Sequence, residues 1–149
     1  MISVAIDGPA GAGKSTLARR LAADFGYIYV DTGAMFRTIG LYALRAGKDP
    51  KDNEAVDALL PNITLEFAFI EGEQHIYLNG EDVSTAIRTE EVGMAASAVG
   101  ANSAARAFLP EMQRDMARTQ NILMDGRDLG TVVLPHATVQ IFLTPRPEA

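Results

Sequence analysis

Lys14 and Ser15 are the residues of this 149-residue sequence best suited to chemistry, because they close the pattern G-x-x-x-x-G-K-S over residues 8–15. An apolar run precedes the pattern, and a stretch with helical spacing follows it as far as Gly26. Glycines let a backbone curl so that its N–H groups point at an anion, and the helix that follows adds the positive end of its dipole. The pattern therefore predicts a loop that binds nucleotide phosphates, with Lys14 reaching the β- and γ-phosphates and the Ser15 hydroxyl binding Mg²⁺.

Four apolar runs predict the strands of a parallel sheet, at residues 2–6, 27–30, 121–124 and 139–143. A helical stretch joins the first two runs, which is the pattern of a βαβ unit. Between residues 62 and 84 the periodicity changes to two, and Asn79-Gly80 predicts a hairpin turn there. The sequence thus predicts an α/β fold with a parallel core sheet, interrupted by an inserted unit that contains a small antiparallel sheet.

Polar segments follow two of the predicted core strands. The residues Asp-Gly-Arg-Asp at 125–128 follow the third run, and Asp-Thr-Gly at 31–33 follows the second, with Arg37 one helical turn later. Ligands of open α/β sheets bind at the carboxyl ends of the strands. An apolar strand that ends in aspartate beside a phosphate loop is typical of a metal-binding arrangement, so Asp125 is a candidate for the metal.

The overall composition argues against several classes of protein. The formal net charge of −6 gives no basic surface for nucleic acid, so the arginines are more suited to small phosphates. The sequence has no cysteine, which excludes disulfides and thiol chemistry. It enters a predicted strand at once and has no apolar run long enough to cross a bilayer. We therefore expect a cytoplasmic enzyme with no membrane or nucleic-acid partner.

Several stretches together resemble the bacterial cytidylate kinase family, at residues 8–16, 31–37, 80–83, 87–92, 96–97 and 125–133. The resemblance covers essentially the whole chain, and residues 87–89 and 125–128 are more specific than the phosphate loop. It implies a P-loop fold with three α/β/α layers. The core would comprise residues 1–36 and 119–149, and a monophosphate-binding insertion would span 37–118, with its antiparallel patch at about 62–84.

The same resemblance implies transfer of the γ-phosphoryl group of ATP, with Mg²⁺, to cytidine monophosphate or deoxycytidine monophosphate by a monomeric enzyme. Lys14 and Arg127 match catalytic positions, and Ser15 matches the metal ligand, with Asp125 acting through a water. The positions that match the ATP-phosphate site are Gly8, Pro9, Ala10, Gly11, Ala12, Gly13, Lys14, Ser15 and Thr16. Those that match the acceptor site are Thr32, Gly33, Arg37, Arg88, Ser97, Arg106, Arg127 and Asp128.

The chemistry of the acceptor agrees with these residue types. Cytosine carries an exocyclic amine, which can donate a hydrogen bond to a carboxylate such as that of Asp128. The acceptor phosphate is largely ionised at neutral pH, with a second pKa of about 6, so no dedicated general base is required. Phosphoryl transfer depends on positioning and charge neutralisation, which arginines and Mg²⁺ supply.

Three alternatives stay open from the sequence: another small-molecule P-loop kinase, a GTP-dependent switch protein, and a non-catalytic nucleotide-binding fragment. The switch protein is disfavoured because the sequence has no Asn-Lys pair of the usual guanine-reading motif. The family continues past residues 147–148 into an arginine-rich lid and a last strand. The sequence therefore resembles a fragment, for which we expect weak phosphate binding and little kinase activity. Pro110 is expected either to kink a helix or to begin a new one.

Overall fold

The structure is a computed structural model that describes residues 2–7, 13–126 and 139–142. The chain divides into two compact units. Met1–Val30 and Gln113–Ala149 form the first unit, and Asp31–Met112 form the second. The functional boundaries predicted near residues 36 and 118 stay predictions.

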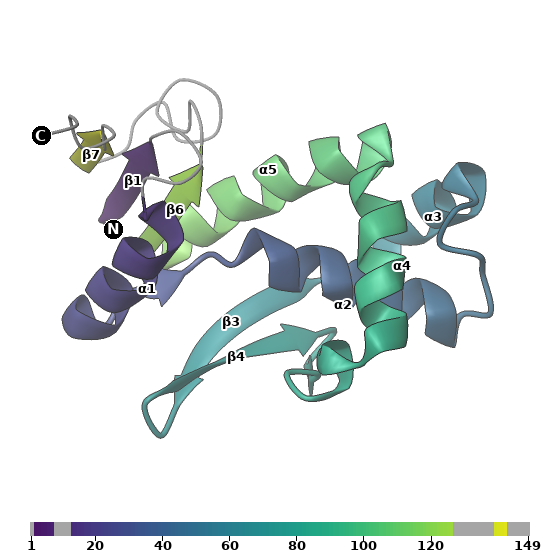
Figure 1. Ribbon diagram of the computed structural model, residues 1–149, viewed down its shortest axis with the longest axis horizontal. Helices are drawn as coiled ribbons and strands as arrows, with labels where there is room; N and C mark the ends of the chain where they lie inside the picture. The colour runs from purple at the N-terminus through teal and green to yellow at the C-terminus, as the bar shows by residue number, and fades with distance from the viewer. Residues whose placement is uncertain (1, 8–12, 127–138, 143–149) are drawn as a thin grey trace, which may run out of the picture. The chain divides into compact units, whose positions relative to one another are not determined.

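A parallel four-stranded sheet lies at the centre of the first unit (Figure 1). Its strands are β1 (Ser3–Asp7), β2 (Ile28–Tyr29), β6 (Ile122–Gly126) and β7 (Val139–Phe142), in the order β2-β6-β1-β7. The register places Ile6 beside Asp125 on one side and beside Ile141 on the other. All four strands predicted from the apolar runs are confirmed, each with shifted ends, and the sheet is parallel as expected.

Helix α1 (Lys14–Phe25) packs on this sheet through small side chains. Ala18 and Ala22 are buried in one cluster with Val4, Ile6 and Leu123, so the helix backbone can approach the strands closely. Gly26 ends the helix at a φ of 69°, where glycine carries no steric penalty, and the next N–H bonds back to the carbonyl of Ala22 at 2.9 Å. The predicted stop at Gly26 is confirmed.

Helices α2 (Thr32–Arg45) and α4 (Glu90–Gly100) form the largest helix–helix contact of the second unit. They approach each other most closely at Gly40, where an added Cβ would lie 3.0 Å from the Cβ of Ala95 and 3.1 Å from the backbone nitrogen of Ala96. A side chain at this position would therefore push the two helices apart. The short elements α3 (Asn53–Leu59), η1 (Leu60–Asn62) and η2 (Ala86–Arg88) complete the helical part.

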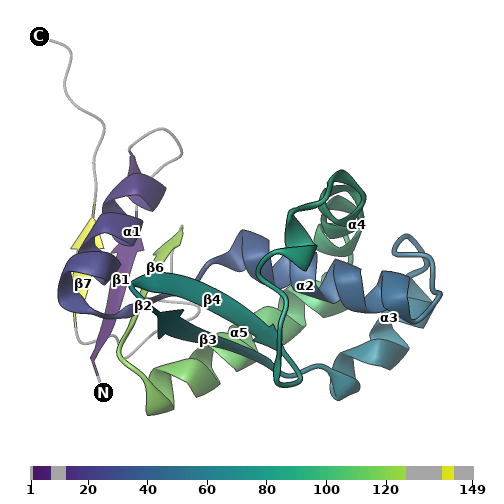
Figure 2. The ribbon, with the colours of Figure 1, turned by 90° about the horizontal axis from the view of Figure 1, so that it is seen from below.

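An antiparallel sheet of three strands forms the other part of the second unit (Figure 2). Strands β3 (Leu65–Ile70), β4 (Glu73–Leu78) and β5 (Glu81–Asp82) follow each other in sequence and in the sheet. Both connections are two-residue turns with positive φ at each position, Glu71-Gly72 and Asn79-Gly80. Such turns match the twist of the strands, and the hairpin predicted at Asn79-Gly80 is confirmed.

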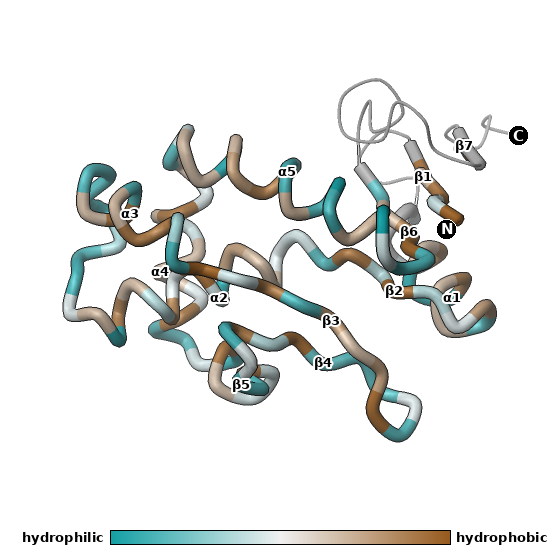
Figure 3. Tube along the Cα trace, turned by 180° about the vertical axis from the view of Figure 1, so that it is seen from behind, coloured by the Kyte–Doolittle hydropathy of each residue, from teal (hydrophilic) through white to brown (hydrophobic). Residues whose placement is uncertain are grey.

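Alternating hydropathy places one face of this sheet in the core, as the colours along β3 and β4 show (Figure 3). Leu65, Phe67, Ile76 and Leu78 are buried, whereas Glu66 between the first two is exposed. The period of two in the sequence therefore corresponds to a sheet with one covered face.

Asn102 separates α4 from α5 (Ser103–Thr119). It is 2% exposed; its Oδ1 accepts from the N–H of Ala104 at 2.9 Å, and its Nδ2 donates to Asp57 at 2.9 Å. The cap thus starts the new helix well before Pro110, which lies inside α5. The expectation that Pro110 begins a helix is wrong; instead it removes the N–H that would pair with the carbonyl of Arg106.

Candidate nucleotide-binding site

The N-terminus of α1 has the features of an anion-binding helix end. Gly13 is its N-cap, with φ 79° and ψ 21°, a left-handed conformation that residues with a side chain rarely adopt. The first turn of α1 contains no acidic residue, so no carboxylate of that turn neutralises the positive end of the helix dipole. Lys14, Ser15 and Thr16 occupy this turn, and the side chains of Lys14 and Ser15 lie outside the described part of the structure.

Asp125 lies near the carboxyl end of β6, in register with Ile6 of the strand that leads to the phosphate loop. The hydroxyl of Tyr29 donates to its Oδ1 at 2.7 Å, and the guanidinium carbon of Arg19 lies 5.4 Å from the centre of the Tyr29 ring. This geometry stacks a cation on the ring whose hydroxyl orients the carboxylate. Tyr29 is a candidate site residue that the sequence analysis missed, because a tyrosine in a short strand has no distinctive spacing.

A magnesium ion would find suitable oxygen chemistry beside Asp125. Mg²⁺ binds few protein carboxylates and takes its other ligands from water and substrate phosphates. In the described residues no group of three or more histidine, aspartate or glutamate side chains is placed to hold a metal alone. The half-buried, oriented carboxylate of Asp125 therefore fits an ion that takes further ligands from a nucleotide.

Arg37 and Arg88 both donate to carbonyls of the segment 84–87 in the second unit, although 50 residues separate Arg37 from its acceptor, Ile87. Arg37 donates from Nη1 to the carbonyl of Ile87 at 3.5 Å, and Arg88, the next residue, donates from Nε to the carbonyl of Ser84 at 3.1 Å. Both arginine side chains are exposed. We call these two residues, each held by a carbonyl at or next to the short 3-10 turn η2, the arginine pair. Guanidinium groups are well suited to binding a phosphate.

Helix α4 lies next to this arginine pair. A Cβ added to Gly93 would lie 3.9 Å from Nη2 of Arg37, and the Ser97 hydroxyl, one turn later, donates to the carbonyl of Gly93 at 3.4 Å. Thr32 and Gly33 occupy the first turn of α2, one turn before Arg37. The structure therefore gathers most of the predicted acceptor residues of the second unit around α2, η2 and α4.

The remaining predicted site residues are not joined to this group by the structure. Arg106 is exposed on α5, and no contact among the described residues links it to Arg37 or Arg88. Five loop residues and two acceptor residues lie outside the described ranges: Gly8, Pro9, Ala10, Gly11, Ala12, Arg127 and Asp128. Their assignments stay predictions.

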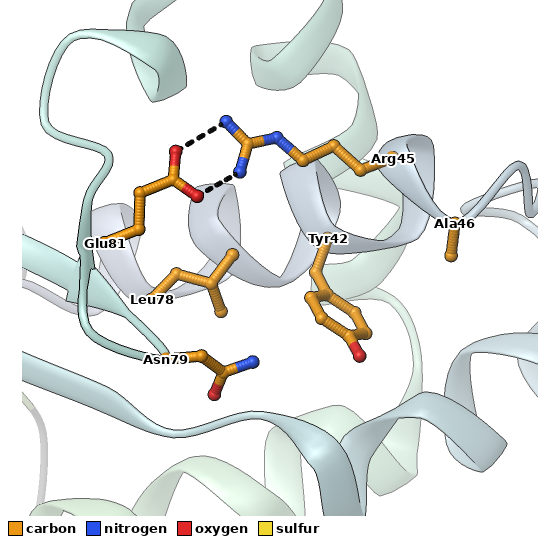
Figure 4. A pocket seen from close by; sticks show the side chains of 6 residues that line it. All are labelled: Tyr42, Arg45, Ala46, Leu78, Asn79 and Glu81. Carbon is orange, nitrogen blue, oxygen red and sulfur yellow. Dashed lines mark hydrogen bonds and ion pairs between the residues drawn. The ribbon is translucent and has the colours of Figure 1, made fainter.

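A separate pocket of about 350 Å³ lies at the other end of α2, lined by Tyr42, Arg45, Ala46, Leu78, Asn79 and Glu81 (Figure 4). The Arg45 guanidinium and the Glu81 carboxylate meet in two hydrogen bonds of 2.8 and 3.1 Å. Arg45 follows Arg37 by eight residues, or ~12 Å along a helix. The pocket is therefore distinct from the arginine pair, and its ion pair ties α2 to β5.

A parallel sheet with a glycine-capped helix, and a separate unit with a small antiparallel sheet, define an α/β fold of the P-loop kinase class. None of the described helices is long and apolar enough to span a membrane. The sequence model of the family named cytidylate kinase matches residues 4–149, so the chain belongs to the cytidylate kinase family.

Curated relatives agree with this assignment. A cytidylate kinase of Lactobacillus gasseri is 50% identical over 143 residues, covering 96% of this chain and 62% of the relative. That of Solibacter usitatus is 47% identical over 147 residues, covering 99% of this chain and 62% of the relative. That of Caldicellulosiruptor bescii is 45% identical over 147 residues, covering 99% and 65%. The chain spans about 62–65% of the length of these relatives.

Proposed function

We propose that this chain forms the phosphate-loop and acceptor-binding parts of an enzyme that transfers the γ-phosphoryl group of ATP to cytidine monophosphate or deoxycytidine monophosphate. The products are the corresponding diphosphate and ADP. The family match over residues 4–149 carries the proposal, and the relatives described above are named cytidylate kinase. The hydrogen bonds of Arg37 and Arg88 to one segment, residues 84–87, support it, because guanidiniums suit a phosphate dianion.

On the donor side, backbone N–H groups of residues 8–16 would hold the ATP phosphates, with the N-terminus of α1 adding its dipole. Lys14 would contact the β- and γ-phosphates as a catalytic residue, joined by Arg127. Ser15 would hold Mg²⁺, and Asp125 would reach the same ion through a water. Bound Mg²⁺ neutralises charge on the β- and γ-phosphate oxygens during transfer.

On the acceptor side, Thr32, Gly33, Arg37 and Arg88 would bind the monophosphate and aim one oxygen at the γ-phosphorus. The remaining acceptor residues would surround the nucleoside: Ser97, Arg106, Arg127 and Asp128. Asp128 would accept a hydrogen bond from the cytosine amine, which uracil lacks. The attacking oxygen needs no base, because the phosphate is largely ionised at pH 7. We further propose a cytoplasmic monomer, which sedimentation of the purified protein tests.

An assay of ATP-dependent transfer to cytidine, uridine, adenosine and guanosine monophosphates tests the proposal. It is run on the 149 residues and on the same residues joined to the remaining part of a relative. We expect the joined protein to phosphorylate the cytidine nucleotide fastest, and the 149 residues alone to show little turnover. Equal or faster transfer to another monophosphate by the joined protein contradicts the proposal.

Lys14→Ala in the joined protein tests the catalytic assignment. We expect turnover to fall about 10²–10³-fold, as when a preorganised transition-state contact is removed. Lys48→Ala, which removes an exposed lysine just after α2, is the matched control and should leave turnover within about twofold. Near-normal turnover in Lys14→Ala would show that another residue neutralises the transferred phosphate.

A further inference from the structure

The carboxylate of Asp82 joins two strands and a loop through its two oxygens. Oδ1 accepts from the Ser84 hydroxyl at 2.7 Å and from the Ser84 N–H at 3.0 Å. Oδ2 lies 2.7 Å from Nδ1 of His75 on β4. The Ser84 hydroxyl also accepts from the N–H of Ile76 at 2.9 Å, so it is fixed from both sides. We call this arrangement of Asp82, Ser84 and His75 the Asp82 clamp.

The clamp leads directly to Arg88. The carbonyl of Ser84 accepts from Nε of Arg88 at 3.1 Å, and the carbonyl of Val83 accepts from the N–H of Ile87 at 3.1 Å. Val83 is fully buried and Ile87 is 6% exposed, which fixes the intervening turn by packing as well. Ile87 in turn offers its carbonyl to Arg37. The segment from Asp82 to Arg88 is therefore anchored at its start, and at its end it carries Arg88 and the carbonyl of Ile87 to which Arg37 donates.

We propose that Asp82 and Ser84 are positioning residues for the acceptor phosphate, which hold the Arg88 side chain by its Nε, while His75 orients the Asp82 carboxylate. The inference rests on the proposed function, because it takes the ligand of Arg88 to be the phosphate of a nucleoside monophosphate. Neither Asp82 nor Ser84 touches the substrate in this account.

Holding Arg88 by Nε leaves its terminal Nη groups, which carry four N–H donors, to face a phosphate. A guanidinium that is already oriented loses less conformational freedom when the phosphate binds, so its preorganisation raises affinity. Hydrogen bonds from the Ser84 side chain, and then from its backbone, keep the pKa of Asp82 below its usual value. The carboxylate is therefore charged at neutral pH, when its acceptor role is needed.

Glu81 provides a matched control within the same two-residue strand. It lies next to Asp82 on β5 and is also hydrogen-bonded to a basic side chain, but its partner is Arg45 at the far end of α2. Glu81→Gln thus removes a carboxylate and an ion pair from β5 without touching the path to Arg88. A general loss of charge on β5 affects both variants, whereas loss of positioning affects only the clamp.

Titration of the 149-residue protein with cytidine monophosphate and with inorganic phosphate, followed by NMR, tests the inference. We expect Asp82→Asn and Ser84→Ala to raise the Kd for both ligands about 5–10-fold at a temperature where each variant is folded. Ser84→Thr restores the hydroxyl and should bind like the wild type within about twofold, as should Glu81→Gln. Unchanged affinity in Asp82→Asn and Ser84→Ala overturns the inference, and so does an equal loss in Glu81→Gln.

A double-mutant cycle with Arg88→Gln separates positioning from general stability. If the clamp acts through Arg88, Asp82→Asn adds less than about twofold to the Kd of a protein that already carries Arg88→Gln. A full additional loss, or an Arg88→Gln protein with wild-type affinity for phosphate, overturns the inference. If Asp82→Asn does not fold, Ser84→Ala takes its place in the double-mutant cycle with Arg88→Gln.

The two claims fail in distinguishable ways. If uridine monophosphate binds as tightly as cytidine monophosphate, the proposed function fails, while the cycle measured with inorganic phosphate still tests the clamp. The NMR signal of the Arg88 Nε–H gives a reading without ligand: in the wild type it should be protected from exchange, and in Asp82→Asn it should exchange at least about fivefold faster. Unchanged exchange in Asp82→Asn overturns the inference.

Discussion

The Tyr29 hydroxyl donates a 2.7 Å hydrogen bond to Oδ1 of Asp125, and so joins the ends of β2 and β6. The two strands are neighbours in the parallel sheet, and Asp125 stands beside Ile6 of β1 in the register. Tyr29 thus orients Asp125, the acidic side chain of β6 that we propose as a partner of the metal. Orientation of a metal-linked carboxylate by a neighbouring donor commonly tunes the affinity for the metal.

Tyr29→Phe removes this hydrogen bond and leaves the ring in place. Because the acceptor is a carboxylate, we expect the free energy of unfolding to fall by about 1.5 kcal/mol, and Mg²⁺ to enhance ATP binding less than in the wild type. Urea unfolding and ATP titrations with and without Mg²⁺ measure the two effects. Tyr27→Phe is the control, since no hydrogen bond of the Tyr27 hydroxyl is recorded among the described residues. Equal stability losses in both variants would contradict a specific role for Tyr29.

Alanine substitutions at Gly40 and Gly100 test how closely α2 and α4 approach each other. Both glycines are helical, but a Cβ at Gly100 meets nothing within 4 Å, whereas at Gly40 it meets Ala95 and Ala96 at 3.0–3.2 Å. Gly100→Ala should therefore raise the free energy of unfolding by about 0.5–1 kcal/mol through helix propensity. Gly40→Ala has to shift backbone, and we expect it to be destabilising by about 1 kcal/mol. Chemical denaturation of both variants measures the two changes. Similar free energies of unfolding in the two variants would show that α4 can shift to accommodate a side chain at Gly40.

Asp82 predicts a pH dependence of stability in the antiparallel sheet. Its pKa in the folded protein lies below the usual value, chiefly because Ser84 donates to the carboxylate. The Asp82 carboxylate therefore contributes fully to the free energy of unfolding above its pKa in the unfolded chain, about 3.9. This contribution is lost as the pH falls through the lower pKa of the folded protein. Unfolding of the wild type and of Asp82→Asn between pH 7 and pH 2.5 checks this. The free energy of unfolding of the wild type should exceed that of Asp82→Asn at pH 7, and this excess should decrease below about pH 4. An excess that stays constant across the range would contradict the prediction.

The parts of the fold that the sequence predicts are those encoded by local patterns. Apolar runs gave the core strands, the period of two gave β3 and β4, and Asn79-Gly80 gave the turn, because each depends on neighbouring residues alone. Asn102 was missed as a helix cap, although its Oδ1 accepts from the nearby N–H groups two and three residues later. Its second hydrogen bond, to Asp57 45 residues away, could not be predicted from local patterns. Of the two roles expected for Pro110, a kink or the start of a helix, the start of a helix is wrong, because Pro110 lies inside α5.

The candidate site shows the same division between local and long-range information. Motif spacing nominated Lys14, the position after a predicted strand nominated Arg37, and the family resemblance alone nominated Arg88. None of these signals could show that Arg37 donates to the carbonyl of Ile87, the residue before Arg88. Ser84 had no assigned role, although Asp-x-Ser is a spacing at which an aspartate can accept from a backbone N–H two residues later.

The central claim is that the acceptor is recognised as a cytidine nucleotide, and the most direct measurement compares cytidine with uridine monophosphate in the wild type and in Asp128→Ala. Calorimetric titration of the protein joined to the remaining part of a relative gives both affinities. The account predicts that the wild type prefers cytidine monophosphate by about 1–3 kcal/mol, and that Asp128→Ala loses most of this preference while binding uridine monophosphate almost as before. Equal binding of the two nucleotides by the wild type would contradict it, as would equal losses for both in the variant.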